Sequence, residues 1–202
     1  MTKSTDQHER DTKRRILEAA LEALRTEGFA GTTSRAIARI GGFNQALIFY
    51  HFGSLDSLLM AALDVSSQER LTRYRDALDQ ANSISALLQL AADIYREDRD
   101  SGHTTVVAQM VAGSLARPEL APQLVQRMQP WIAFCEDAIN KTLAQSPAAQ
   151  VLPRGDLAYA LVTFYLGVNL VTHFDEDGSR TNALFEHAVA FAPLLEQMLG
   201  RA

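Results

Sequence analysis

Apolar residues recur at helical spacing in every long segment of the chain, and no segment shows the sustained alternation of a strand. The sequence therefore predicts an all-α fold. Nine helices are expected, at about residues 11–27, 34–40, 45–51, 55–81, 84–100, 104–116, a seventh reaching about 145, 156–174 and 182–199. Glycine, proline and capping residues mark the ends of these segments. Pro130 and Pro193 are expected to bend the helices that contain them.

Charge is distributed unevenly along the chain, with a boundary near Phe52. Residues 1–53 hold 8 Lys and Arg against 6 Asp and Glu, whereas residues 54–202 hold 11 against 18, within a net charge of −5. This polarity fits a small head that approaches phosphate groups on an acidic body that repels them. A solvated helix face would give a similar local cluster of basic residues, so both interpretations stay open.

The sequence gives no support to secreted, metal-dependent or catalytic proteins. The first residues carry charges with no apolar run behind them, and the single cysteine, Cys135, cannot form an intramolecular disulfide. Both features suit a cytoplasmic protein. The histidines show no metal-ligand spacing, and neither a Gly-rich phosphate loop nor a nucleophile elbow appears. We therefore expect no metal, no cofactor and no enzymatic activity.

The stretch from Thr32 to Leu59 contains the most informative local pattern. Two short amphipathic segments are joined by Gly41-Gly42 and follow a longer helix, which is the arrangement of a helix-turn-helix. Segments this short are not stable alone, so their apolar residues are expected to share a small core with the first helix. Their polar residues are then left to face outward.

The outward residues suit the major groove of DNA. Thr33 and Asn44 are expected to cap the two short helices, because such side chains accept hydrogen bonds from the first backbone amides. In a helix-turn-helix the start of the second helix meets base edges, where the amides of Asn44 and Gln45 can pair with adenine. Asn44 has a second interpretation as a cap alone, which leaves Gln45 for DNA.

The same stretch resembles the signature of the tetracycline-repressor (TetR) family of bacterial transcription regulators. The resemblance rests on several residue types at fixed offsets within the expected helices. The matching residues are Thr33, Ile37-Ala38, Gly42, Ile48-Phe49-Tyr50-His51-Phe52, Ser54, Asp56 and Leu58. The motif covers about residues 11–60, and the nine-helix layout extends the resemblance to the whole chain.

This resemblance implies both an architecture and a function. It implies a two-domain protein, with a three-helix DNA-binding helix-turn-helix domain at residues 1–53 and a ligand-binding and dimerisation domain at residues 54–202. It also implies a homodimeric repressor that binds double-stranded operator DNA and is released by an unidentified small-molecule effector. The dimer would pair through helices near 156–174 and 182–199. The alternative is a helical small-molecule-binding protein whose DNA-binding head is weakened or non-specific.

The residues expected to contact DNA lie on and beside the two short helices. They are Thr33, Ser34, Arg35, Asn44, Gln45, Ala46, Phe49, Tyr50, His51 and Ser54. Three departures from the family pattern bear on binding strength. Gly41 should loosen the turn, Phe49 lacks the hydroxyl of the usual tyrosine, and Leu55 lacks the charge of the usual lysine. Four basic residues are candidates to supply the lost charge, Lys13, Arg14, Arg15 and Arg35.

The body contains an uncharged segment and a set of candidate ligand contacts. Residues 157–174 form an 18-residue segment without Asp, Glu, Lys or Arg, which is long enough to span a membrane. The polar residues within this segment favour a buried helix or a dimer helix instead. We therefore expect no contact with a membrane. A pocket is the family's expectation, built from apolar walls and a few polar groups. The candidates are His103, Gln109, Met110, Trp131, Phe134, Tyr165, Asn169 and His173. A packed core with satisfied polar groups would look the same in sequence.

Overall fold

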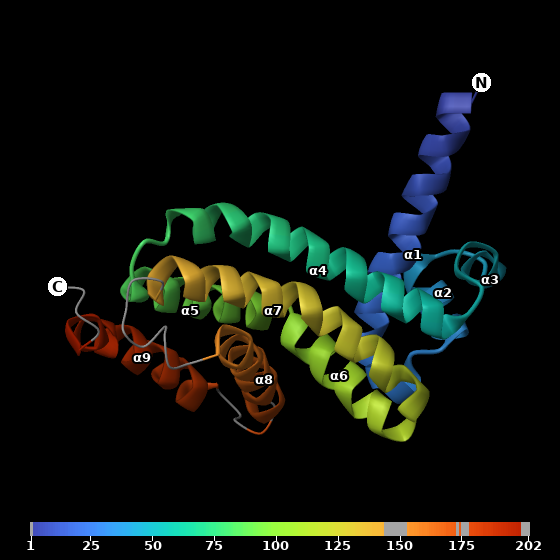
Figure 1. Ribbon diagram of the computed structural model, residues 1–202. Helices are drawn as coiled ribbons and strands as arrows, with labels where there is room; N and C mark the ends of the chain where they lie inside the picture. The colour runs from blue at the N-terminus through green and yellow to red at the C-terminus, as the bar shows by residue number, and fades with distance from the viewer. Residues whose placement is uncertain (1, 144–152, 173, 175–177, 199–202) are drawn as a thin grey trace. The chain divides into compact units, whose positions relative to one another are not determined.

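The computed structural model describes residues 2–143, 153–172, 174 and 178–198. Throughout those residues the chain is all-α, as expected, and contains no β-strand (Figure 1). The helices are α1 (Thr2–Gly31), α2 (Ser34–Gly41), α3 (Ala46–Phe52), α4 (Leu55–Gln80), α5 (Ile84–Asp100), α6 (His103–Ala116), α7 (Ala121–Leu143), α8 (Arg154–Thr172) and α9 (Ser179–Met198). A short 3-10 helix, η1 (Pro118–Leu120), lies between α6 and α7.

The first helix is longer than expected. α1 begins at Thr2 rather than near Asp11, because residues 2–10 are polar but contain neither glycine nor proline. An ion pair between Glu9 and Lys13 at 2.9 Å, one turn apart, supports this added stretch. Gly28, which follows the expected end of this helix at residue 27, does leave the helical conformation, with φ 68° and ψ 175°, although helical turns resume as far as Gly31.

The boundaries of α8 and α9 also lie slightly earlier than expected. α8 spans 154–172 rather than 156–174, because its first turn already begins with a bond from the Leu157 amide to the Pro153 carbonyl at 3.1 Å. α9 starts at Ser179 rather than after Thr181, because Gly178 takes a left-handed conformation (φ 65°) directly before it. The expected end of the seventh helix near residue 145 falls outside the described residues.

Packing divides the chain into two compact units. The first contains the chain up to Gln68 together with Thr105–Leu124, and the second contains Glu69–Thr104 together with the chain from Val125 onward. The first unit therefore extends past the boundary expected at residue 53, because the start of α4 and most of α6 pack into it. The assignment of DNA binding to residues 1–53 concerns function and stays a prediction.

The first unit is built around one apolar cluster to which five α-helices and η1 contribute buried residues. Its members include Ile16 and Leu24 of α1, Ile37 of α2, Ile48 of α3, Leu58 of α4 and Met110 of α6. Full burial of such a side chain stabilises a fold by about 1.5–3 kcal/mol relative to exposure. Because α3 has only 7 residues, its position depends on this cluster rather than on its own helical stability.

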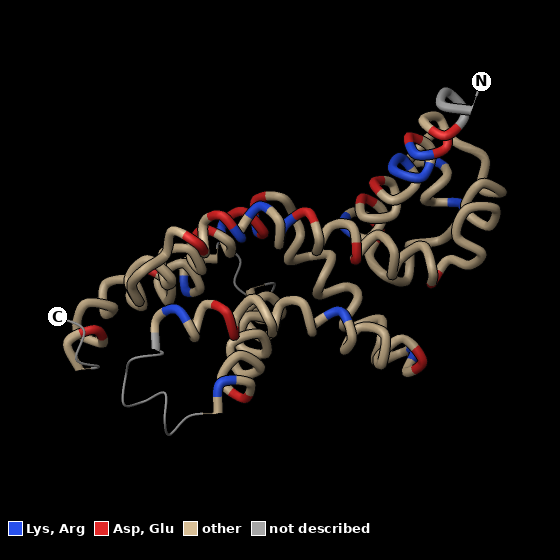
Figure 2. Tube along the Cα trace, turned by 45° about the horizontal axis from the view of Figure 1, so that its top comes forward, with Lys and Arg blue, Asp and Glu red and all other residues tan. Residues whose placement is uncertain are grey.

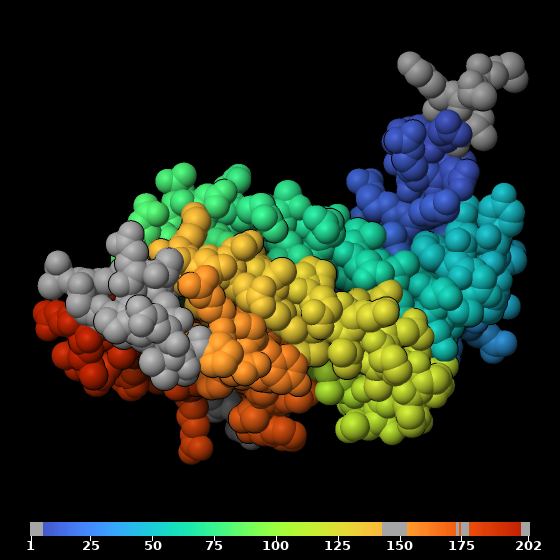
Figure 3. All heavy atoms as spheres, viewed as in Figure 1, coloured from blue at the N-terminus to red at the C-terminus, as the bar shows by residue number. Residues whose placement is uncertain are grey.

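The second unit has an apolar cluster of its own. It contains Leu71, Tyr74 and Leu78 of α4, Ile94 of α5 and Phe134 of α7. In this unit α4 and α7 lie side by side (Figures 1 and 3). Lys141 of α7 donates to the carbonyl oxygens of Leu78 and Asp79 at 3.1 and 3.0 Å. These carbonyls belong to the last turn of α4, where backbone acceptors run out of donors within the helix. The Leu78 carbonyl also accepts from the Ala81 amide at 3.1 Å, and Lys141 adds a cap at that end.

The last two helices leave many apolar side chains uncovered. α8 is long and apolar enough, by length and composition, to pass as a membrane span, yet only 17% of its 18-residue apolar segment is buried. Polar side chains of α8 form hydrogen bonds within the second unit. For example, Asn169 Nδ2 donates to the Tyr165 carbonyl at 2.7 Å. The exposed apolar residues are Tyr159, Leu161, Phe164 and Val171 on α8 and Leu184, Phe191, Leu194, Leu195 and Met198 on α9. Exposed apolar area on this scale indicates an interaction surface.

Candidate nucleic-acid interface and effector site

The turn between α2 and α3 depends on two glycines. Gly42 has φ 64°, a left-handed conformation, and its amide bonds to the Ala38 carbonyl at the end of α2. A Cβ atom on Gly41 would lie 2.1 Å from the Phe43 ring and 3.0 Å from the Ala19 side chain. The missing Cβ is therefore what allows Phe43 to pack against the head, and the expectation that Gly41 loosens the turn stays a prediction.

Arg15 holds the same turn from α1. Its Nη2 donates to the Gly42 carbonyl oxygen at 3.3 Å, and its guanidinium carbon lies 5.6 Å from the centroid of the Phe43 ring. The contact with the Phe43 ring is a cation–π interaction, and together with the hydrogen bond to Gly42 it orders the turn. Arg15 was expected as a source of charge for phosphate, and the structure gives it this packing role within the head.

The other basic residues of the head differ in how they are paired. Lys13 and Arg14 form exposed ion pairs along α1, with Glu9 at 2.9 Å and with Glu18 at 3.7 Å. Exposed pairs of this kind contribute little free energy, so a phosphate group can replace the acidic partner. Arg35 is exposed on α2 and makes no hydrogen bond or ion pair within the described part of the chain. It can therefore reach DNA without giving up a contact.

Both short helices are capped as expected. Thr33 Oγ1 accepts a hydrogen bond from the Ala36 amide at 3.1 Å, and Asn44 Oδ1 accepts one from the Ala46 amide at 2.9 Å. The cap on α3 occupies the carbonyl oxygen of the Asn44 side chain, which bidentate pairing with adenine would also need. Gln45 has no such cap bond and is therefore the amide available for base contact.

The exposed side of α3 consists of four residues, Gln45, Ala46, Phe49 and Tyr50, which we call the reading face. All four are exposed, with Phe49 at 49% and Tyr50 at 79%. Residues three and four apart share one side of a helix, and the opposite side holds fully buried Ile48. The reading face and the whole of α3 carry no Lys, Arg, Asp or Glu (Figure 2).

Three further predicted DNA contacts lie outside the reading face. His51 is half-buried, with its ring edge-on to Tyr50 at a centroid distance of 4.8 Å. Ser54 accepts a hydrogen bond from the Ser57 amide at 3.0 Å and so caps α4. Ser34 opens α2 and is partly exposed. The assignment of these residues to DNA binding stays a prediction.

The residues expected to bind an effector separate into two groups. Gln109 and Met110 lie in the first unit, where Gln109 Oε1 accepts from the Phe29 amide at 2.8 Å and Met110 is 1% exposed in the apolar cluster. The members in the second unit are His103, Trp131, Phe134, Tyr165 and Asn169. His173 lies outside the described residues.

A buried ion pair lies among the second group. Arg70 of α4 and Asp98 of α5 form it, with side chains 11% and 1% exposed. Tyr165 of α8 donates its hydroxyl to Asp98, Nε2 of His103 on α6 lies 2.6 Å from Arg70 Nη1, and the Trp131 ring of α7 lies 4.7 Å from the Arg70 guanidinium. Five helices thus each contribute one side chain to what we call the Arg70–Asp98 cluster.

The protonation of the cluster follows from its chemistry. A guanidinium has only donors, so His103 Nε2 must accept and the ring proton lies on Nδ1. Burial raises the pKa of the Asp98 carboxyl. The charge of Arg70 and the hydrogen bond from Tyr165 oppose this effect, because each lowers the pKa. Burial and the neighbouring Asp98 raise the pKa of Tyr165, which therefore remains a donor at neutral pH.

One donor in the cluster has no acceptor. Arg70 Nε is buried and finds no hydrogen-bond partner within the described residues, so the cluster can still satisfy one acceptor atom of a ligand or a water. Neither Arg70 nor Asp98 was predicted from sequence. Each is a single charged residue on a helix with several others, and only the packed structure distinguishes it from a solvated one.

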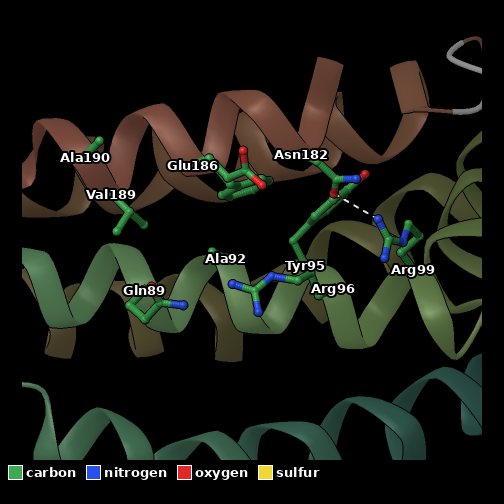
Figure 4. Close-up of a pocket in the computed structure, with 10 residues that line it drawn as sticks. Gln89, Ala92, Tyr95, Arg96, Arg99, Asn182, Glu186, Val189 and Ala190 are labelled. Carbon is green, nitrogen blue, oxygen red and sulfur yellow. Dashed lines mark hydrogen bonds between the residues drawn. The ribbon is translucent and has the colours of Figure 1, made fainter. Parts of the chain in front are cut away.

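A separate pocket of about 380 Å³ lies between α5 and α9 of the second unit (Figure 4). Tyr95 and Phe185, whose rings stack at a centroid distance of 4.8 Å, are among its lining residues. Arg99 Nη1 donates to Asn182 Oδ1 at 2.9 Å from the facing helix. None of the described residues that were predicted to bind an effector lines this pocket.

The helix-turn-helix matches a known family profile, that of the bacterial regulatory proteins of the tetR family, over residues 16–62. The HTH-type transcriptional regulator TtgR of Pseudomonas putida is 23% identical over 155 residues, which cover 76% of this chain and 74% of TtgR. The likeness in sequence therefore reaches well beyond the head.

Two solved structures are similar in fold. Salmonella enterica GusR superposes with a TM-score of 0.71 at 21% identity, covering 94% of this chain and 96% of that one. The multidrug binding protein EbrR, complexed with imidazole, superposes with a TM-score of 0.59 at 20% identity, covering 87% and 93%. At these identities the likeness shows a shared fold.

Proposed function

Since the chain belongs to the TetR family of bacterial regulatory proteins and is a DNA-binding transcription regulator, we propose that it acts in the cytoplasm as a homodimeric repressor that a small molecule releases from its operator. The reading face of α3 is the observation that carries this proposal. A short helix held in place by a buried core, with an amide exposed at its start and two aromatic rings exposed further along the same side, suits insertion into a major groove.

Phosphate contacts around the reading face would set its register on the duplex. Arg35 is exposed on α2 without an ion-pair partner in the described chain. The start of α4 offers backbone amides at Ser54 and Leu55, because the first amides of a helix have no acceptor within it and attract anions. Such contacts fix orientation, whereas the reading face would supply sequence preference.

Dimerisation is supported by the uncovered apolar residues of α8 and α9. Phe164 and Phe191 are 53% and 60% exposed, and their helices carry most of the other exposed large apolar side chains of the second unit. Pairing these helices with their copies across a two-fold axis would bury this surface. A dimer would also present two recognition helices, which must lie about 34–36 Å apart to enter successive major grooves.

The Arg70–Asp98 cluster is our candidate for the effector site. It combines the aromatic ring of Trp131, the hydroxyl of Tyr165 and a buried donor on Arg70, which is the mixture that small-molecule sites use. Arg70 belongs to α4, whose first residues directly follow α3, the proposed recognition helix, along the chain. A ligand that changed the partners of Arg70 would therefore act on α4, and a coupling of about 1–3 kcal/mol is typical of such regulation.

The proposal is tested by measuring fluorescence anisotropy of labelled duplexes taken from the DNA that flanks the gene. Gln45→Ala and Tyr50→Ala should weaken binding to the preferred duplex while melting temperature stays unchanged, because both side chains are exposed. Val65→Ala, an exposed apolar residue of α4 outside the reading face, is the matched control. Specific binding that survives both substitutions would show that α3 does not read the operator.

Release is tested separately with a library of small molecules. A true effector should raise the melting temperature of the wild-type protein and weaken its binding to the operator. Trp131→Ala should reduce both effects while operator binding without the compound is retained. If every active compound keeps full potency against this variant, the effector binds elsewhere.

A further inference from the structure

The reading face has an unusual chemistry for a surface that meets DNA. It presents one amide, one methyl group, one phenyl ring and one phenol, with no charge among them. The phenyl ring of Phe49 is 49% exposed. A phosphate oxygen needs a hydrogen-bond donor or a cation, and a phenyl ring offers neither. The ring therefore has no favourable contact to make with the phosphate groups of a duplex.

The base edges offer Phe49 a partner of matching chemistry. In the major groove the C5-methyl group of thymine is the apolar group among the base pairs, and apolar side chains contact it. The other small apolar group of the reading face, the Ala46 side chain, is exposed at the start of the same helix. Two apolar contacts on one face favour a site that contains thymine.

The spacing of Phe49 and Gln45 defines where that thymine would lie. They are four residues apart, so they share one side of α3 and are separated by about one helical turn, roughly 5.4 Å. Successive bases along one strand are about 3.4 Å apart. The two side chains therefore address base pairs about one or two steps from each other.

We propose that Phe49 is a specificity-determining residue of this regulator and contacts the C5-methyl group of a thymine one or two base pairs from the position read by Gln45. The inference rests on the docking of α3 proposed above. Burial of one methyl-sized group corresponds to about a fourfold change in affinity. A two-fold symmetric dimer on two half-sites would show the effect twice, roughly fifteenfold in all.

The test uses duplexes that differ by single methyl groups. The preferred operator is first selected from a random duplex pool with the wild-type protein, and each thymine is then replaced singly by deoxyuridine, which removes only the C5-methyl group. Equilibrium dissociation constants are measured by anisotropy. We expect one position in each half-site where the replacement weakens wild-type binding about fourfold.

Variants of the protein assign that effect to Phe49. In Phe49→Ala the penalty at that position should fall to less than about 1.5-fold, as a double-mutant cycle between two contacting groups requires. Val65→Ala should keep the full penalty, since Val65 is exposed on α4 away from the reading face. Circular dichroism should show unchanged helix content in both variants.

Three results would overturn the proposal. The first is an operator at which no deoxyuridine replacement weakens binding. The second is a sensitive position whose penalty persists in Phe49→Ala, because another residue would then contact the methyl group. The third concerns Phe49→Tyr: if this variant binds specific and random duplexes more tightly alike, the ring lies at a phosphate. A selection that yields no preferred sequence would instead reject operator recognition by α3 itself.

Discussion

The side chain of Gln109 accepts a hydrogen bond from the backbone amide of Phe29 at 2.8 Å, across 80 residues of sequence. Gly28 leaves the helical conformation just before this amide, with φ 68°, so the amide requires an acceptor from another segment. Gln109 comes from α6 and supplies it. A residue expected to bind an effector therefore repairs a break in α1 within the first unit.

Removing this acceptor should destabilise the first unit. Gln109→Met keeps a side chain of similar length but leaves the Phe29 amide without a strong partner, and an unsatisfied buried group costs about 1–3 kcal/mol. The urea midpoint measured by circular dichroism should fall accordingly. Gln126→Met, at an exposed position of α7, serves as the control. Equal midpoints for the two variants would contradict the structural role of Gln109.

The Arg70–Asp98 pair should show strong coupling in a double-mutant cycle. Arg70→Met or Asp98→Leu alone leaves one buried charge without its counterpart, which is expected to reduce the free energy of unfolding by about 3–5 kcal/mol. The double variant removes both charges and should recover most of that loss, since apolar replacements of a buried pair are often neutral. Urea titrations of all four proteins measure this. Additive losses would mean that the two charges do not interact.

The reactivity of Cys135 should be low in the folded protein and should depend on pH. Burial raises the pKa of its thiol to about 11 from an ordinary value of 9.0. At pH 8 the reactive thiolate is then about a hundredfold rarer than in an exposed cysteine. Ellman's reagent should react slowly with native protein and rapidly in urea, and Cys135→Ser should give no signal. Rapid reaction of the native protein would contradict the burial.

The same pKa shift has a consequence for stability. A folded-state pKa above the unfolded value means that folding favours the neutral thiol. The contribution of the thiol to the free energy of unfolding is complete below about pH 9 and is lost as the pH rises towards 11. Alkaline unfolding curves of the wild type and Cys135→Ser should therefore diverge only above about pH 9.

Local chemistry explains which features were predictable from the sequence. The caps at Thr33, Asn44 and Ser54 involve amides two or three residues away, so their signal lies entirely within a short stretch. Helical periodicity likewise reports burial on one side of each helix, and it located all the main helices. The start of α1 was placed too late because residues 2–10 lack apolar residues, although nothing in them prevents a helix.

The features that sequence could not supply are contacts between distant segments. Gly41 appeared to weaken a turn, and only the position of the Phe43 ring shows that a Cβ there would collide. Arg70 and Asp98 are 28 residues apart, and each resembles a solvated charge on its own helix. For the same reason a ligand site was predicted from residues that the fold assigns to separate units.

Charge placed on the uncovered face of α8 or α9 should prevent dimerisation. Phe164→Glu and Phe191→Glu each put a carboxylate where the copies are proposed to pack, and an unpaired charge there opposes burial. Analytical ultracentrifugation should change from twice the 22.2 kDa chain mass to 22.2 kDa. Leu115→Glu, at an exposed apolar position of α6, should remain dimeric. A wild-type monomer at micromolar concentration would reject the proposed dimer.

The last prediction concerns Leu55, the first residue of α4, where the family pattern has lysine. Leu55 is partly buried against the apolar cluster of the first unit. In Leu55→Lys the aliphatic stem can keep part of that packing while the ammonium reaches solvent. A cation near a helix N-terminus is unfavourable by about 0.3–1 kcal/mol, so the free protein should be slightly less stable.

On DNA the added charge should have the opposite effect. Each subunit would neutralise one more phosphate, and a plot of log K against log[salt] for the dimer should steepen by about 2. Affinity should rise for operator and random duplexes alike, because phosphate contacts carry no sequence information. Val65→Lys adds the same charge further along α4, where it is exposed, and should change the slope less. If the two variants give equal slopes, the start of α4 does not face the phosphates, and the head docks on DNA by another surface.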